Sequence, residues 1–309
     1  MEGAILRFAA ASRLAPTDPG LLRSLATLCL RAGRPAEAWS AAETGLRLQP
    51  ADRDFTNNRL AAMAAAGFLD AALALARRWA SEAPGEAQAR HRLGSLLLQT
   101  GDAPAGLAEL EAALALRPDW PEALIAAAEA AFRDRQVDRA RAWLDKAVAL
   151  DPENQTVRMA RATILLSLEI WDPGLHDYEY RLRPSAAREI VRHRLTVPRW
   201  QGEDLSGRTL LVVAEQGIGD QIRFARDLAA LQRLCAGLIV ECTPRLAPLL
   251  KRSLPEVTVM PSVERREGHR HTFTYDWLAQ LGPIDAYIEA GSILLRLWQR
   301  GILPDRSGG

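Results

Sequence analysis

Five prolines recur in the first half of the chain at a fixed interval of 34 residues, and this spacing constrains the fold more than any other feature. They are Pro16, Pro50, Pro84, Pro118 and Pro152. Glycines keep the same interval 17 residues after the first, second and third prolines: Gly33, Gly67 and Gly101. Glycine permits a tight turn and proline ends a helix, so each unit is predicted to hold two helices. A repeat of this length predicts a stacked array in which each unit covers the apolar face of its neighbour.

The 34-residue unit resembles the tetratricopeptide repeat (TPR), in which two paired helices meet through small side chains. At the contact positions the chain carries Ala26, Gly94, Ala128 and Ala162 in the first helices, and Ala38, Ala72, Gly106 and Ala140 in the second. Residues before Pro16 match a second helix, so the array is expected to begin with half a repeat. A last, degenerate unit has Glu169 where the turn glycine stood. The resemblance implies a bacterial TPR solenoid over residues 1–183, with a half repeat and about five helix pairs.

The first helices of such an array form a concave inner wall, which in repeat proteins binds extended peptides or partner helices. The repeat template places a mixed set of side chains on this wall: Arg23, Asn57, His91, Ser95, Ile125 and Glu129. We therefore expect protein–protein interaction through the groove. The set matches neither a repeated asparagine ladder nor a clamp for a terminal carboxylate, and a purely structural arm stays open as the alternative.

Residues 184–208 are predicted to be a basic linker between the array and the rest of the chain. Arginines are frequent in and just before this segment, and Pro184 and Pro198 break any long helix. Such a run could contact phosphate, but a solvated helix that packs on a neighbour is the commoner outcome.

Beyond residue 208 the hydrophobic pattern changes from paired helices to alternating strands and helices. The stretches "TLLVVA", "GLIVEC" and "VTVM" are short apolar runs typical of buried strands, and residues with helical spacing lie between them. This order predicts a parallel sheet, and thus a Rossmann-like α/β domain over residues 209–309.

The loop after the first of these strands, "AEQGIGDQIR", allows two interpretations. A dinucleotide-binding loop is favoured by Gly217 and Gly219, with Glu241 at the end of the next strand. Ile222 stands where the third glycine of that motif belongs. Asp220 is the stronger objection, because its carboxylate would repel a bound pyrophosphate at the start of the helix.

The other interpretation comes from a resemblance to bacterial TPR proteins that carry a GT-B glycosyltransferase domain, related to heptosyltransferases and O-linked N-acetylglucosamine transferases. The segments that carry it are "YEYRLR", "PRWQGEDLSGRTLLVVAEQGIGDQIRFARDL" and "VECTPRLAPLLKRSLPEVTV". The resemblance implies that Asp220 is a catalytic base. It also implies a loop that meets an acceptor's anionic group, formed by Glu215, Gln216, Gly217, Ile218, Gly219 and Arg226. Independently, an aspartate at a helix start is expected to cap that helix.

The chain stops about where the first half of a GT-B domain would finish, and the resemblance places the nucleotide sugar in the second half. We therefore expect a domain that is inactive alone, on an interaction protein. The alternative is the acceptor half of a glycosyltransferase, which moves a sugar from a nucleotide sugar to a sugar or protein hydroxyl when a second half is supplied.

Global composition narrows the remaining classes. The net charge is +1, so nothing favours nucleic acid or an anionic membrane as partner. Three scattered cysteines encode neither a disulfide framework nor a zinc site, and no apolar run is long enough to span a bilayer. The segment "ERREGHRH" is expected to be a solvated loop. The sequence thus predicts a cytoplasmic protein with no metal and no cofactor.

Overall fold

The chain is described by a computed structural model that covers residues 2–183, 189–193, 195–215, 217–267 and 270–302. It divides into two compact units, Met1–Glu169 and Ile170–Gly309. The boundary predicted from the repeat spacing lies further along the chain, after Arg183.

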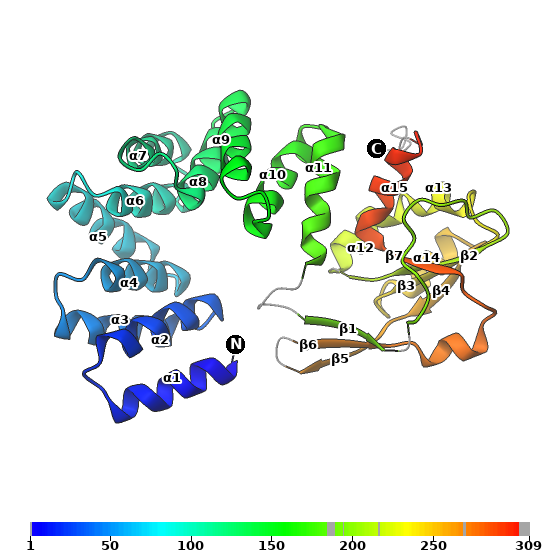
Figure 1. The fold of residues 1–309 in the computed structure, drawn as a ribbon, viewed down its shortest axis with the longest axis horizontal. Helices are drawn as coiled ribbons and strands as arrows, with labels where there is room; N and C mark the ends of the chain where they lie inside the picture. The colour runs from blue at the N-terminus through cyan, green and yellow to red at the C-terminus, as the bar shows by residue number, and fades with distance from the viewer. Residues whose placement is uncertain (1, 184–188, 194, 216, 268–269, 303–309) are drawn as a thin grey trace. The chain divides into compact units, whose positions relative to one another are not determined.

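The first unit is a succession of helices joined by short turns, as predicted by the proline interval. Consecutive helices contact each other along the unit, and Figure 1 shows them side by side from α1 to α10. Their bounds are α1 Glu2–Leu14, α2 Pro19–Arg31, α3 Pro35–Leu48, α4 Arg53–Ala65, α5 Leu69–Glu82, α6 Ala87–Gln99, α7 Ala103–Leu116, α8 Pro121–Arg133, α9 Val137–Leu150 and α10 Gln155–Ser167.

The turn inside each repeat places one residue in the left-handed region of backbone space. Gly33, Gly67 and Gly101 have φ values of 69°, 90° and 90°. At the same position of the next two repeats, Arg135 and Glu169 keep φ values of 63° and 61° without being glycine. This backbone costs about 1 kcal/mol or more for a residue with a Cβ. The packing of the helices therefore imposes the turn even where the sequence does not favour it.

The predicted contact positions between paired helices are confirmed as the tightest part of the array. The six alanines among them have no exposed surface. The two glycines meet each other: a Cβ on Gly94 would lie 2.7 Å from Leu110 Cγ and 2.8 Å from the carbonyl oxygen of Gly106. Helices α6 and α7 thus approach as closely as two backbones can at this point.

The second unit contains a parallel sheet, as predicted, and a second sheet that was not. The larger sheet has four parallel strands in the order β4-β3-β2-β7, and the smaller has the order β1-β6-β5, with β1 parallel and β5 antiparallel to β6. The strands are β1 Glu189–His193, β2 Thr209–Val213, β3 Gly237–Cys242, β4 Thr258–Pro261, β5 Val263–Glu267, β6 Arg270–Thr274 and β7 Ala286–Glu289. The helices are α11 Trp171–Tyr178, α12 Ile218–Ala225, α13 Leu228–Gln232, α14 Ala247–Ser253 and α15 Ile293–Gln299, with short 3₁₀ helices η1 Glu179–Leu182, η2 Asp276–Gln280 and η3 Ala290–Ser292.

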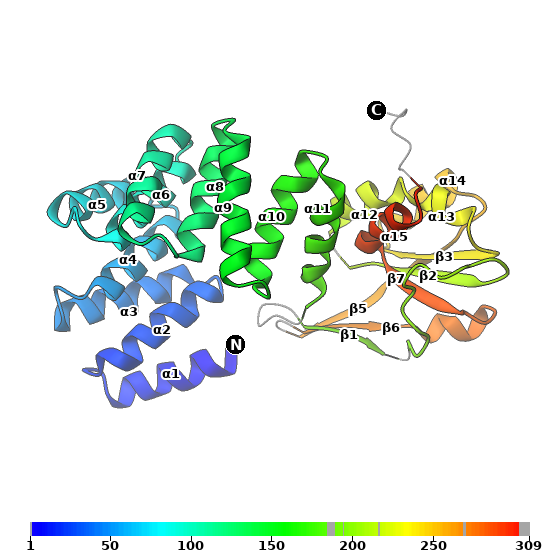
Figure 2. The same cartoon turned by 45° about the horizontal axis from the view of Figure 1, so that its top comes forward.

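Alternate residues of β2 face two different cores. Leu210 and Val212 pack with helices α12 to α15, whereas Leu211 and Val213 pack with Phe273 of β6 and with η2. In the described residues, one face of the larger sheet is therefore covered by helices and the other by the smaller sheet (Figure 2). This explains why β2 is apolar at every position after Thr209.

Two expectations are corrected by the smaller sheet. Part of the predicted linker forms β1, so this basic segment is a strand and not a solvated helix. The predicted loop "ERREGHRH" contributes to β5 and β6, which pair from Val263–Thr274 to Glu267–Arg270. Its two central residues, 268 and 269, lie outside the described residues. Charged side chains on one face of each strand hide the alternation that a half-buried strand needs.

Candidate functional site

The first helices of successive repeats form a common wall. Helices α2, α4, α6, α8 and α10 each contact the next in the series. The structure places the predicted wall residues on four of them: Arg23 on α2, Asn57 on α4, His91 and Ser95 on α6, and Ile125 and Glu129 on α8. Glu129 is exposed and the others are half-buried or partly exposed. Their role in binding remains a prediction.

Arg23, at the first end of the wall, is neutralised by acids of the following repeat. Its Nη2 donates to Asp52 Oδ2 at 2.5 Å, and its Nε lies 3.5 Å from Asp54 Oδ2. The guanidinium also stacks over the ring of Phe55, with 5.3 Å between Cζ and the ring centroid. Arg23 therefore stiffens the contact between α2 and α4, and its charge is balanced within the chain.

Asn57 is engaged by an arginine that the sequence interpretation left off the binding set. Arg92 Nε on α6 donates to Asn57 Oδ1 on α4 at 2.8 Å. One helix earlier, Asn58 Nδ2 donates to Thr27 Oγ1 on α2 at 3.4 Å. Polar side chains thus link the first three helices of the wall sideways. The 34-residue register could have identified Arg92, because it follows the wall residue His91 directly.

His91 lies beside an aromatic side chain of the next repeat. Its ring centroid is 4.5 Å from that of Trp120, over which the Arg117 guanidinium also stacks. Burial and the nearby charge of Arg92 lower the pKa of His91 to about 4, so its imidazole is neutral at pH 7. This part of the wall offers a flat, uncharged surface next to Arg92. Glu129, further along, pairs with Arg133 on its own helix.

In the second unit, the predicted loop begins with a buried ion pair. The Glu215 side chain is 4 % exposed, and its Oε1 accepts hydrogen bonds from Arg181 Nη2 at 2.8 Å and from the Gly291 amide at 2.8 Å. A Cβ on Gly291 would lie 2.4 Å from that oxygen. Glu215 therefore fixes the loop to the end of β7 and does not face solvent.

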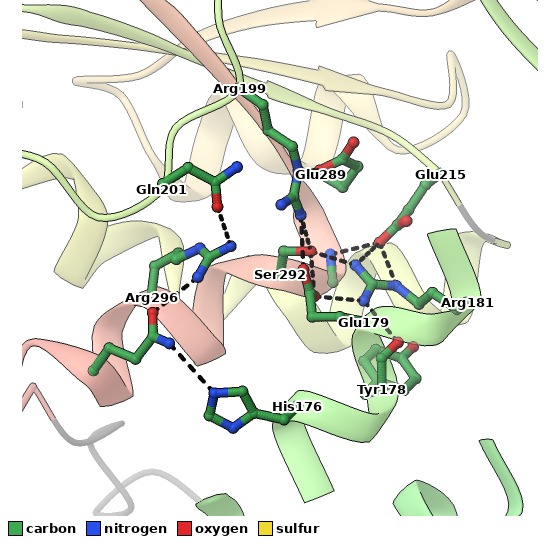
Figure 3. A network of polar contacts seen from close by, with 12 residues as sticks. His176, Tyr178, Glu179, Arg181, Arg199, Gln201, Glu215, Glu289, Ser292 and Arg296 are labelled. Atoms are coloured by element: carbon green, nitrogen blue, oxygen red, sulfur yellow. Dashed lines mark hydrogen bonds and ion pairs between the residues drawn. The ribbon is translucent and has the colours of Figure 1, made fainter. Parts of the chain in front are cut away.

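Glu215 belongs to a larger ion-pair cluster, shown in Figure 3, which is formed by Glu179, Arg181, Arg199, Glu215, Glu289 and Ser292. Arg199 Nε donates to Glu289 Oε2 at 2.6 Å. Ser292 Oγ donates to Glu179 Oε1 at 2.6 Å and accepts from Arg181 at 2.7 Å. Burial opposes the charge of Glu179, but Arg181, Ser292 and Arg199 outweigh it and hold its pKa below the ordinary value. The cluster joins η1 to the ends of β2 and β7, and sequence reasoning missed it.

The rest of the predicted loop is open to solvent. Gly217, Ile218 and Gly219 are exposed, and the Asp220 side chain is 40 % exposed with its Oδ1 3.3 Å from Arg223 Nη2. Gln216 lies outside the described residues. The Arg226 side chain is largely exposed and its Nε lies 3.9 Å from Asp227 Oδ1.

The expectation that Asp220 caps its helix is wrong. The N-cap residue of α12 is Gly217, and no side-chain hydrogen bond caps the helix there. Asp220 lies within the first turn, where the partial positive charge of the helix start favours a carboxylate. Its proposed catalytic role stays a prediction from the resemblance.

A second polar group lies where the ends of β2 and β3 meet the smaller sheet. Glu241 Oε2 accepts from the Ala214 amide at 3.0 Å and from Tyr275 Oη at 3.3 Å, and lies 3.8 Å from Arg192 Nη1. Glu241 Oε1 is buried and has no hydrogen-bond partner among the described residues. Burial is the largest influence and raises the pKa of Glu241 to about 7, despite the opposing effect of Arg192. The residue expected to bind a ribose is thus a buried joint between two sheets.

Neither a metal site nor a membrane-crossing helix is found in the part of the chain that the structure describes. Its His, Cys, Asp and Glu side chains form no group of three or more arranged to hold a metal ion. None of its helices combines the length and apolar character that a bilayer-spanning segment needs.

Comparison with known proteins agrees with the fold of the first unit. A family model described as "Tetratricopeptide repeat" matches residues 91–155. The Cut9–Hcn1 hetero-tetramer of the APC/C has a TM-score of 0.50 at 17 % identity, over 59 % of this chain and 36 % of that chain. A thermophilic TPR protein of Thermus thermophilus has a TM-score of 0.48 at 20 % identity, over 52 % of this chain and 88 % of that one. The first unit is a helical TPR solenoid, and the chain is a TPR-repeat protein.

Among curated proteins, the chain is similar to Protein FlbA of Caulobacter vibrioides, a bacterial protein. The two are 29 % identical over 258 residues, which is 82 % of this chain and 43 % of FlbA. The chain thus spans less than half the length of this relative. The glycosyltransferase interpretation of the second unit rests on the sequence resemblance alone.

Proposed function

We propose that this protein binds an extended segment of a partner protein along the wall formed by α2, α4, α6, α8 and α10. The observation that carries the proposal is that wall side chains are held by neighbouring helices and yet remain partly exposed. Asn57 is fixed by Arg92 and His91 by Trp120. Side chains positioned before binding lose little further entropy on contact with a partner, which is what a recognition surface requires.

Site-specific photo-cross-linking in the full chain tests this proposal. A photoreactive side chain at Ser95, on the wall, is expected to capture one partner segment from an extract of the producing cells. The matched control is Ala74, an exposed position on the second helix α5. Mass spectrometry of the adducts should find that segment at Ser95 and not at Ala74. Equal capture at both positions contradicts binding along the wall.

Glycosyl transfer by the second unit is the second candidate, and one observation favours it. The exposed residues of the loop lie just after β2, at the carboxyl end of parallel strands, where α/β sheets bind their ligands. In this role Asp220 would accept the proton of the acceptor hydroxyl. Turnover of a panel of nucleotide sugars, with the donor-binding half of a related transferase added, tests it. Turnover that survives Asp220→Asn refutes the role of Asp220.

A further inference from the structure

Arg92 differs from other arginines near the wall because its charge is not balanced by an acid. Arg23 pairs with Asp52, and Arg53 Nε lies 3.3 Å from Glu86 Oε2. Among the described residues, no acidic side chain lies within ion-pair distance of Arg92, whose one hydrogen bond is the Nε contact with neutral Asn57. Burial lowers the pKa of Arg92 to about 10, so it still carries its charge at pH 7.

The hydrogen bond to Asn57 also fixes how the guanidinium is presented. It uses Nε and engages neither Nη1 nor Nη2, the two terminal nitrogens, which form the fork that binds a carboxylate. A half-buried cation with an unused fork is costly for the free protein and gains most from an incoming anion. The neutral His91 beside it adds no competing charge at pH 7.

Beyond α6 the wall becomes apolar. At the positions of His91 and Arg92 in the next repeat stand Ile125 and Ala126, which pack against the core of the array and remain partly exposed. Neighbouring helices lie about 10 Å apart and an extended chain advances about 3.3 Å per residue. A bound segment therefore passes from Arg92 to Ile125 in about three residues.

We infer that the wall recognises an extended acidic and apolar segment of its partner. An Asp or Glu side chain pairs with the free fork of Arg92, and an apolar side chain about three residues away packs on Ile125 and Ala126. This inference rests on the proposed function, since it names the chemistry of the segment that the wall binds.

Selection from a library of random dodecapeptides, displayed on phage as N-terminal fusions without a free C-terminus, tests the inference with the full chain. Wild-type protein should enrich peptides with an acid about three residues from an aliphatic or aromatic residue. Arg92→Glu should instead enrich Lys or Arg at the acidic position. The matched control is Arg77→Glu, the same charge reversal at an exposed position on α5, and it should keep the wild-type motif.

Binding of one fluorescent consensus peptide then gives the magnitude. Replacing its acid by the amide, or Arg92 by Gln, should weaken binding about tenfold to a hundredfold, with no further loss when both are changed. Arg92→Lys keeps the charge and should restore part of the affinity. Circular dichroism and thermal unfolding of each variant show whether the array still folds.

The outcomes separate the two proposals. If the enriched peptides lack an acid, or if Arg92→Glu selects the same peptides, the inference is wrong while wall binding stands. If no peptide is enriched, or if the bulky substitution Ser95→Trp on the wall leaves peptide binding unchanged, both the inference and the proposed function are wrong.

Discussion

Replacement of Glu241 by glutamine is expected to stabilise the second unit at high pH and to leave it unchanged at low pH. The Glu241 side chain has no exposed surface, and one of its oxygens lacks a partner among the described residues. A carboxylate there has lost its water, and Arg192 at 3.8 Å compensates for only part of that loss. Glutamine has the same shape and can still accept from the Ala214 amide, but it never carries the charge.

The sign follows from the raised pKa. Folding raises the pKa of Glu241 from its ordinary value of 4.5 to about 7, so the folded state holds the proton more tightly than the unfolded state. Stability therefore falls as the pH rises from about 4.5 to 7, and it is constant with respect to this group above that range. A difference of about 2.5 pKa units corresponds to about 3 kcal/mol. We expect Glu241→Gln to gain up to that amount at pH 8.

Hydrogen exchange of the β2 and β3 amides, measured by mass spectrometry between pH 5 and pH 8, reports this unit separately from the repeats. The protection of these strands should rise in Glu241→Gln relative to wild type as the pH increases. The control is Glu256→Gln, at an exposed position, which should change nothing. A variant that loses protection at pH 8 would show that the charged Glu241–Arg192 pair stabilises the fold, and the reasoning would be refuted.

Three further predictions concern single positions. Arg135→Gly should stabilise the first unit by about 1 kcal/mol in urea unfolding, because Arg135 holds a φ of 63°; an unchanged midpoint would contradict this. Gly94→Ala should destabilise it by about 1–3 kcal/mol in the same assay, since the added Cβ would meet Leu110 at 2.7 Å; a neutral result would mean that α6 and α7 separate without cost. Asp220→Asn should lower stability by about 0.5 kcal/mol or less, because its pair with Arg223 is exposed; a loss near the roughly 1 kcal/mol or more of a lost cap would restore the capping interpretation.

The repeat array could be predicted from the sequence because each unit specifies its own helices, turn and contacts within 34 residues. The turns at Arg135 and Glu169 show how far this holds: the neighbouring units impose the left-handed backbone although the local residue opposes it. The strands β2, β3 and β4 were predictable for a similar reason, because burial on both faces makes a short run apolar throughout. Strand β1 was not, since its Arg192 reads as a solvated charge until the smaller sheet buries it.

The same difference separates the predictable part of the candidate site from the rest. Periodicity assigns a residue to the wall, because wall positions repeat with the helices, and it placed Asn57 and His91 there. It cannot tell which arginine is already paired, since Arg23 meets Asp52 only through the packing of α2 against α4. In a chain with nearly balanced charges, a cation that lacks an internal acid is therefore more informative than a basic segment. By that criterion Arg92 marks the most specific point of the wall, and the basic run around Arg199, whose charge Glu179 and Glu289 neutralise, does not.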